Sequence, residues 1–271
     1  MDRHRGELLF VLMGEPLGTS QGSNMFLRRY DQRGVDAKRR RSRARRRNSP
    51  WYRLSFRRRP NSKGLRIVTA NNQPAYTAEE ALSRLKDGNA RFVSGHAQFP
   101  TVQKEVLAEL AKGQQPYATV LGCSDSRVPP ELVFDAGFGE LFVVRVAGNV
   151  LGPSIVGTLQ YARAYLHTPL FIVLGHESCG AVKAAIASRF HGARHQSRIA
   201  LLLENIVPAL DSLDRTLPPA TLLNAAVEAN VRWTVREVLE SPEGRVRVAE
   251  GDVKLVGAVY ELASGHVRFL E

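Results

Sequence analysis

The sequence has little cysteine and no long apolar segment, and both absences limit what the protein can be. Only two cysteines occur in 271 residues, Cys123 and Cys179, too few for a fold held together by several disulfide bonds. A single disulfide between them is one alternative, but we favour reduced thiols that bind a metal or take part in a reaction. Reduced thiols indicate a cytoplasmic protein. No apolar run approaches the ~20 residues that a membrane-spanning helix needs. The run at residues 8–13 is also too short and wrongly flanked for a signal peptide.

Acidic residues are scarce at the N-terminal end of the chain. The net charge of +12 at first suggests a nucleic-acid partner, but residues 1–69 contain 19 Lys and Arg against 5 Asp and Glu. The remaining residues contain 19 Lys and Arg against 21 Asp and Glu, so they form an ordinary, slightly acidic protein. We therefore predict a basic, unstructured tail over 1–70 and one catalytic domain over 71–271. Nucleic acid or an anionic membrane surface could bind the tail, although a solvated tail without specific function, or an extension upstream of the true start codon, is the simpler interpretation.

Helix and strand patterns alternate from residue 77 onward. Thr77 and Glu80 form a capping box that predicts a helix to about residue 94. Apolar strand patterns follow, separated by helical ones, and the chain closes with a hairpin around residues 264–265. The expected helices lie at about 102–112, 152–166, 179–190, 197–213 and 219–240, and the expected strands at about 117–122, 141–146, 170–175, 252–262 and 266–270. This order predicts an α/β domain with a mainly parallel central sheet flanked by helices and a C-terminal β-hairpin.

Two buried strand patterns each end in a residue that can bind a metal. Residues 117–122 precede Cys123, and residues 170–175 precede His176, which Cys179 follows three positions later. In parallel sheets, functional residues gather just beyond the carboxyl ends of the strands. If the two strands are neighbours, Cys123, His176 and Cys179 meet at one point. Two thiolates and one imidazole suit zinc with a fourth position left open.

The stretch from Cys123 to Arg127 places Cys123, Asp125 and Arg127 at alternate positions. In extended backbone their side chains point to one side, where Asp125 and Arg127 can form a charge-assisted pair. His176 and Cys179 stand at i and i+3, which would bring both to one side of a helical turn. A lone His-x-x-Cys more often marks a packed core, but its combination with Cys123 favours a metal site.

These motifs resemble those of the β-class carbonic anhydrases. The resemblance rests on Cys123-Ser-Asp-Ser-Arg127, Phe142-Val-Val-Arg145, Gly148-Asn149 and Gly175-His-Glu-Ser-Cys-Gly180, and it extends from about Thr77 to the C-terminal hairpin. It implies a zinc lyase that reversibly hydrates carbon dioxide to bicarbonate and a proton. One Zn²⁺ per subunit would sit on Cys123, His176 and Cys179, and zinc-bound hydroxide would attack carbon dioxide.

The resemblance also assigns roles around the metal. Asp125 would accept a hydrogen bond from the zinc-bound hydroxide, and Arg127 would hold this carboxylate away from the zinc. In a closed state Asp125 would itself become a metal ligand. Gln114 matches the substrate-binding glutamine of the plant-like subtype, whereas the other subtype has a tryptophan where this chain has Val120. Substrate-binding positions further matched are Phe142, Ala147, Tyr161 and Gly180.

The family resemblance implies at least a homodimer, in which N-terminal helices contribute to dimerisation and Gln114 reaches the partner's site. Two other functions stay open. The same fold and metal could hydrolyse carbon disulfide or carbonyl sulfide, although Gln114 and the Asp125–Arg127 pair argue against this. The protein could also be a non-enzymatic binder of nucleic acid or anionic surfaces that acts through its basic tail.

Overall fold

The described part of the protein comprises residues 76–98, 104–241, 244–245 and 253–270 of a computed structural model. All of it belongs to one compact unit, Ile67–Glu271. The expectations about the basic tail lie outside the described residues. Among the helices that can be described, none is both long and apolar enough to cross a membrane.

A five-stranded sheet in the order β2-β1-β3-β4-β5 forms the centre of this unit. Its first four strands run parallel and β5 is antiparallel to β4. The strands are β1 (Ala118–Gly122), β2 (Leu141–Arg145), β3 (Leu170–His176), β4 (Lys254–Tyr260) and β5 (Val267–Leu270). The predicted mainly parallel sheet and the C-terminal hairpin are thereby confirmed.

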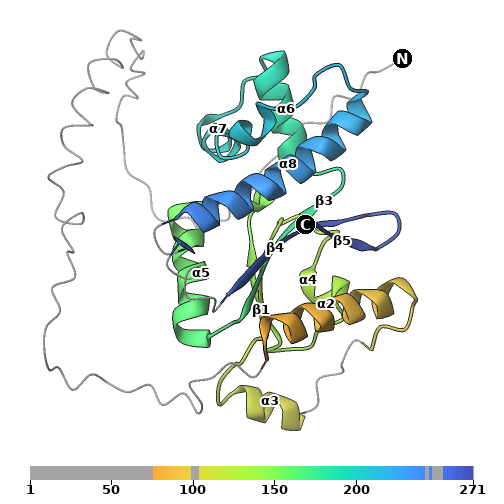
Figure 1. The fold of residues 1–271 in the computed structure, drawn as a ribbon, viewed down its shortest axis with the longest axis vertical. Helices are drawn as coiled ribbons and strands as arrows, with labels where there is room; N and C mark the ends of the chain where they lie inside the picture. The colour runs from red at the N-terminus through yellow and green to blue at the C-terminus, as the bar shows by residue number, and fades with distance from the viewer. Residues whose placement is uncertain (1–75, 99–103, 242–243, 246–252, 271) are drawn as a thin grey trace, which may run out of the picture. The chain divides into compact units, whose positions relative to one another are not determined.

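Helices cover both faces of the sheet (Figure 1). On one face lie α2 (Ala78–Val93) and the short α4 (Pro130–Val133), which pack against Val120, Ile172 and Leu174. The opposite face is covered by the helices α5 (Pro153–Leu166), α6 (Gly180–His191), α7 (Ser197–Leu203) and α8 (Pro219–Glu240). All seven residues of β3 are buried, because apolar side chains point alternately to two covered faces.

Most predicted helices occur where the sequence places them. Thr77 caps α2, with the predicted reciprocal hydrogen bonds to Glu80. The second helix is confirmed over a shorter range, as α3 (Lys104–Leu110). The single helix expected over 197–213 is wrong: α7 ends at Leu203, and a separate 3-10 helix, η5 (Val207–Leu210), follows. Pro208 lies within η5, and proline cannot donate the backbone hydrogen bond that a continuous α-helix requires.

Helix α8 approaches the sheet closely because two strand residues lack side chains. Val231 of α8 is fully buried. A Cβ atom on Gly175 of β3 would lie 2.5 Å from Val231 Cγ2, and one on Gly257 of β4 would lie 2.9 Å from Val231 Cγ1. Gly257 pairs with Val173 in the neighbouring strand, so one valine fills a depression made by two glycines. This contact fixes the distance between α8 and the end of β3.

We predict that Gly175→Ala destabilises the protein by about 1–3 kcal/mol, because the added methyl group would overpack the contact with Val231. The matched control is Gly157→Ala, at an exposed position of α5, where nothing lies within 4 Å of the new Cβ. That substitution should leave stability unchanged or raise it by up to ~1 kcal/mol, since alanine favours helix over glycine. Chemical denaturation measures both; equal stability of the two variants would contradict the close packing of α8.

Candidate metal centre

The two predicted ligand loops leave the same edge of the sheet. β1 and β3 are adjacent and parallel, with Gly122 opposite Leu174. Cys123 therefore follows the last residue of β1 while His176 is the last residue of β3. The expectation that the strands are neighbours and bring their ligands together is confirmed.

Cys123, His176 and Cys179 form a compact buried cluster. Their potential ligand atoms all lie within 4.8 Å of one another. The two Sγ atoms are 4.0 Å apart and the thiols are free, well beyond the ~2.05 Å of a disulfide bond. None of the three residues is more than 5% exposed. Two soft donors and one imidazole thus share a site that bulk water scarcely reaches.

The orientation of His176 leaves one ring nitrogen available. Its Nδ1 lies 2.8 Å from the carbonyl oxygen of Glu177 and donates a hydrogen bond to it. Its buried Nε2 has no hydrogen-bond partner in the described structure. A buried polar atom without a partner is costly, whereas a histidine that donates through one nitrogen typically binds a metal through the other.

The backbone around His176 differs from the predicted helical turn. His176 still belongs to the strand, Ser178 has a positive φ of 54°, and Cys179 is the N-cap of α6. The loop is anchored from the C-terminal hairpin, since the Glu177 carboxylate accepts a hydrogen bond from the Leu262 N–H at 3.1 Å. A strand end and a tight turn, rather than one face of a helix, bring His176 and Cys179 together.

The predicted Asp125–Arg127 pair is present and bidentate. Arg127 Nε donates to Asp125 Oδ1 at 2.9 Å and Arg127 Nη2 donates to Oδ2 at 2.8 Å. The backbone is not extended as we expected. A turn forms in which the Val128 N–H donates to the Asp125 carbonyl at 3.1 Å, and the Arg127 N–H also bonds Asp125 Oδ1 at 3.0 Å. Asp125 Oδ2 lies 3.9 Å from His176 Nε2, which places this carboxylate beside the cluster.

The structure adds residues to which the sequence assigned no role. Arg145, the last residue of β2, donates through Nε to the Cys123 carbonyl at 2.9 Å and through Nη2 to the Asp125 carbonyl. The Gly148 N–H donates to Cys123 Sγ at 3.3 Å. Arg145 and Gly148 belong to the motifs that carry the resemblance, and Arg145 ends a strand at the same edge of the sheet as Cys123. That position was the available signal for a role in the site.

The surroundings shift the pKa values of the two thiols in opposite directions. The hydrogen bond between the sulfurs lowers the pKa of Cys123, and the same contact together with burial raises the pKa of Cys179. Burial acts to lower the pKa of His176, but attraction to the nearby Cys123 sulfur and the hydrogen bond to the Glu177 carbonyl reverse the direction, so this pKa is raised. Without a metal only Cys123 therefore tends to ionise, and a bound cation would favour ionisation of both thiols.

Asp125 stays ionised because of its contact with Arg127. Its hydrogen bonds with the Arg127 guanidinium hold the pKa of the carboxyl far below its usual range. Unlike Cys179, Asp125 needs no metal to keep its charge. It therefore presents a carboxylate beside the cluster at any pH near neutrality.

The donor set fits a metal ion and fits zinc best. An unpaired imidazole nitrogen and two sulfurs converge in a buried site, and Asp125 is already paired with Arg127. Three ligands of these types are common in catalytic zinc sites, which keep a fourth position for water or substrate.

The remaining predicted site residues are the expected substrate-binding ones: Gln114, Phe142, Ala147, Tyr161 and Gly180. Gly180 begins α6 directly after Cys179, and Ala147 precedes Gly148. Phe142 on β2 and Tyr161 on α5 contact each other with ring centroids 6.1 Å apart. Gln114 is exposed in the loop before β1. Within the described residues, no ring contact or hydrogen bond links Gln114, Phe142 or Tyr161 to the three candidate ligands.

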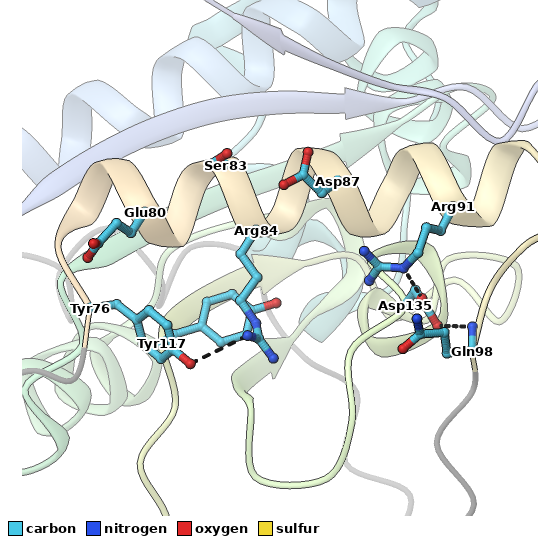
Figure 2. A pocket seen from close by; sticks show the side chains of 9 residues that line it. All are labelled: Tyr76, Glu80, Ser83, Arg84, Asp87, Arg91, Gln98, Tyr117 and Asp135. Carbon is cyan, nitrogen blue, oxygen red and sulfur yellow. Dashed lines mark hydrogen bonds and ion pairs between the residues drawn. The ribbon is translucent and has the colours of Figure 1, made fainter.

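A separate hollow of about 530 Å³ lies along α2 (Figure 2). The Arg84 guanidinium carbon lies 5.5 Å from the ring centroid of Tyr76 and 4.9 Å from that of Tyr117. Asp135 accepts hydrogen bonds from Arg91 Nε at 2.6 Å and from the Gln98 N–H at 2.8 Å. These contacts attach α2 to the start of β1 and to the segment after α4. No candidate metal ligand lines the hollow, so it is distinct from the metal centre.

Comparison with known proteins agrees with this site. A family model described as carbonic anhydrase matches residues 118–267. Carbonic anhydrase 2 of Mycobacterium tuberculosis is 38% identical over 191 residues, which cover 68% of this chain and 89% of that protein. The solved structure of the β-carbonic anhydrase CcaA has a TM-score of 0.58 and 26% identity, covering 70% of this chain and 87% of that one.

A β-carbonic anhydrase from Coccomyxa, solved with acetazolamide, is similar as well. It has a TM-score of 0.56 at 27% identity and covers 70% of this chain and 86% of that structure. The mainly parallel sheet, the Cys-His-Cys cluster and these relatives lead to one conclusion. The chain belongs to the β-class carbonic anhydrases.

Proposed function

We propose that the protein binds one Zn²⁺ per chain through Cys123, His176 and Cys179 and reversibly hydrates carbon dioxide to bicarbonate and a proton. The observation that carries this proposal is that His176, whose buried Nε2 is unpaired, places a ring nitrogen within 4.8 Å of two thiol sulfurs. Bound zinc supplies the Lewis acidity that makes a water molecule nucleophilic near neutral pH. The two free thiols also lead us to place the enzyme in the reducing cytoplasm.

Asp125 is the proposed hydrogen-bond acceptor for the attacking water. Its Oδ1 already accepts two hydrogen bonds from Arg127, whereas Oδ2 accepts one and is the oxygen nearer to the cluster. Oδ2 therefore retains a lone pair that can orient water toward carbon dioxide. The bidentate contact with Arg127 would also keep Asp125 from becoming a fourth metal ligand. Loss of that contact would permit the closed state that the family resemblance implies.

Substrate binding is proposed to use several groups around this centre. The Gly180 N–H lies at the exposed start of α6, and nothing lies within 4 Å of where a side chain would begin. That space suits a small anion such as bicarbonate, which a helix N-terminus attracts. Ala147, Phe142 and Tyr161 are the proposed apolar wall, and Gln114 the proposed donor to substrate.

We propose at least a homodimer as the active form. β2 is an edge strand with the apolar residues Leu141, Phe142 and Val143 only partly buried. It has neither proline nor lysine, which commonly protect exposed edges. Tyr161 is 46% and Phe138 65% exposed. A second copy covering this region would bury these rings and bring Gln114, Phe142 and Tyr161 to a partner's site.

The direct test is metal content together with turnover of the purified full chain. We expect about one Zn²⁺ per chain and rapid hydration of carbon dioxide, because a zinc site of this kind activates water. Parallel assays on carbon disulfide separate the hydrolase alternative, which predicts the reverse preference.

Deletion of residues 1–69 should leave both zinc and turnover intact. Loss of turnover with zinc retained would contradict a dispensable tail.

Asp125→Asn should lower turnover by about 100-fold or more while zinc content is retained, because the amide keeps the shape but presents a weaker acceptor. Asp211→Asn is the control, since Asp211 is an exposed carboxylate that pairs with Arg189 on the surface. It should change neither zinc content nor turnover. Parallel loss of zinc and activity in Asp125→Asn would instead assign Asp125 to metal binding.

Turnover should rise from pH 6 to pH 9. Two thiolates offset the formal charge of Zn²⁺, so water is acidified less than at a site with three neutral ligands. Asp125 does not contribute to the rise, because its lowered pKa leaves it ionised throughout this range. A pH profile of kcat at constant ionic strength measures the effect. A flat profile would contradict this account of the site's charge.

A further inference from the structure

Helix α8 reaches the metal centre through one polar side chain. Asn230 is only 1% exposed and lies beside Val231, the residue that packs on Gly175. Its Nδ2 donates to the Gly148 carbonyl at 2.9 Å. The N–H of the same Gly148 donates to Cys123 Sγ at 3.3 Å. Asn230, Gly148 and Cys123 are thus linked in a chain of two hydrogen bonds.

The conformation of Gly148 is strongly constrained. Its φ is +71°, in the left-handed region that favours glycine. A Cβ there would lie 2.7 Å from Ile206 Cδ1 and 3.1 Å from Ala181 Cβ. The Asn230 side chain holds the carbonyl of Gly148 while Ile206 and Ala181 limit its other side. The direction of the Gly148 N–H toward the sulfur therefore depends on a contact from α8.

Stability alone explains this asparagine poorly. Asn230 Oδ1 is buried and has no hydrogen-bond partner in the part of the chain that is described. A buried polar atom left unpaired destabilises the folded protein. Most other buried positions on α8 are apolar, namely Leu222, Ala226, Val227 and Val231, and an apolar residue at 230 would avoid the cost. Such local exceptions to good packing are typical of functional positions.

We propose that Asn230 is a positioning residue for the Cys123 ligand. It holds the Gly148 carbonyl and, through the constrained backbone torsions of Gly148, fixes the preceding peptide unit, whose N–H donates to the Cys123 sulfur. This inference rests on the proposed metal site. A hydrogen bond to a thiolate stabilises negative charge on sulfur and lowers its donation to the cation. Asn230 would thereby set both the position and the donor strength of one metal ligand without touching the metal.

Thr234 provides a matched control one helical turn further along α8. It is also buried, and its Oγ1 donates to the Asn149 carbonyl at 3.4 Å. Thr234→Val removes that hydrogen bond at similar volume, and no hydrogen bond joins Thr234 to Gly148 among the described residues. A general loosening of α8 would affect both sites, whereas the proposed role is specific to Asn230.

The experiment compares the full-length wild type with Asn230→Leu, Asn230→Ser and Thr234→Val. Each protein is prepared with zinc and, separately, with cobalt(II) as a spectroscopic probe. Both Asn230 variants should bind zinc about 10-fold more weakly in competition with a chelator, because the Cys123 sulfur is no longer held in position, which outweighs its stronger donation. Their thiolate-to-cobalt charge-transfer band should shift to lower energy, because a sulfur that has lost its hydrogen bond donates more strongly. Thr234→Val should match the wild type in both measurements.

Unchanged zinc affinity and an unchanged band in the Asn230 variants would overturn the proposal. Equal changes in Thr234→Val would overturn it too, by showing that α8 acts only as general support. Asn230→Ser decides the matter if Asn230→Leu fails to fold, because serine is small and too short to reach Gly148. A wild type that takes up neither zinc nor cobalt would refute the proposed metal site itself, a distinguishable result.

Discussion

The metal centre depends on one constraint, the adjacent parallel pairing of β1 and β3. Parallel strands end at the same edge of a sheet, so the residues that follow them meet without any long excursion of the chain. The register Gly122 opposite Leu174 sets Cys123 next to the end of β3. His176, the last residue of that strand, then needs only a short turn to bring Cys179 to the same point. A different strand order would separate the ligands even if every motif were unchanged.

The surroundings of the cluster act through charge and through rigidity. The Arg127 guanidinium neutralises the ionised Asp125 carboxylate beside the cluster and leaves the two sulfurs to a cation. Rigidity comes from contacts that approach the loops from other elements. Arg145 holds the backbone of the Cys123 loop, and the hairpin holds Glu177. Because these contacts come from separate strands, the ligand geometry depends on several strands at the carboxyl end of the sheet.

Sequence patterns succeeded where local physics decides the outcome. Apolar runs identified the strands, the capping box identified the start of α2, and the metal-capable residues identified the site. They failed where a turn or a tertiary contact overrides local preference. The spacing of Cys123, Asp125 and Arg127 suggested extended backbone, but the Asp125 carboxylate stabilises a turn by accepting the Arg127 N–H. The break between α7 and η5 was missed although Pro208 signals it.

The sequence by itself determined which side chains can bind a metal and that they follow buried strands, because residue chemistry and hydrophobic periodicity are local properties. Only the tertiary structure decided that β1 and β3 are neighbours, that His176 Nε2 faces two sulfurs, and that Asn230 of α8 reaches Gly148. These features join residues far apart in the chain. Strand order and helix packing, which no short stretch of sequence encodes, set their distances.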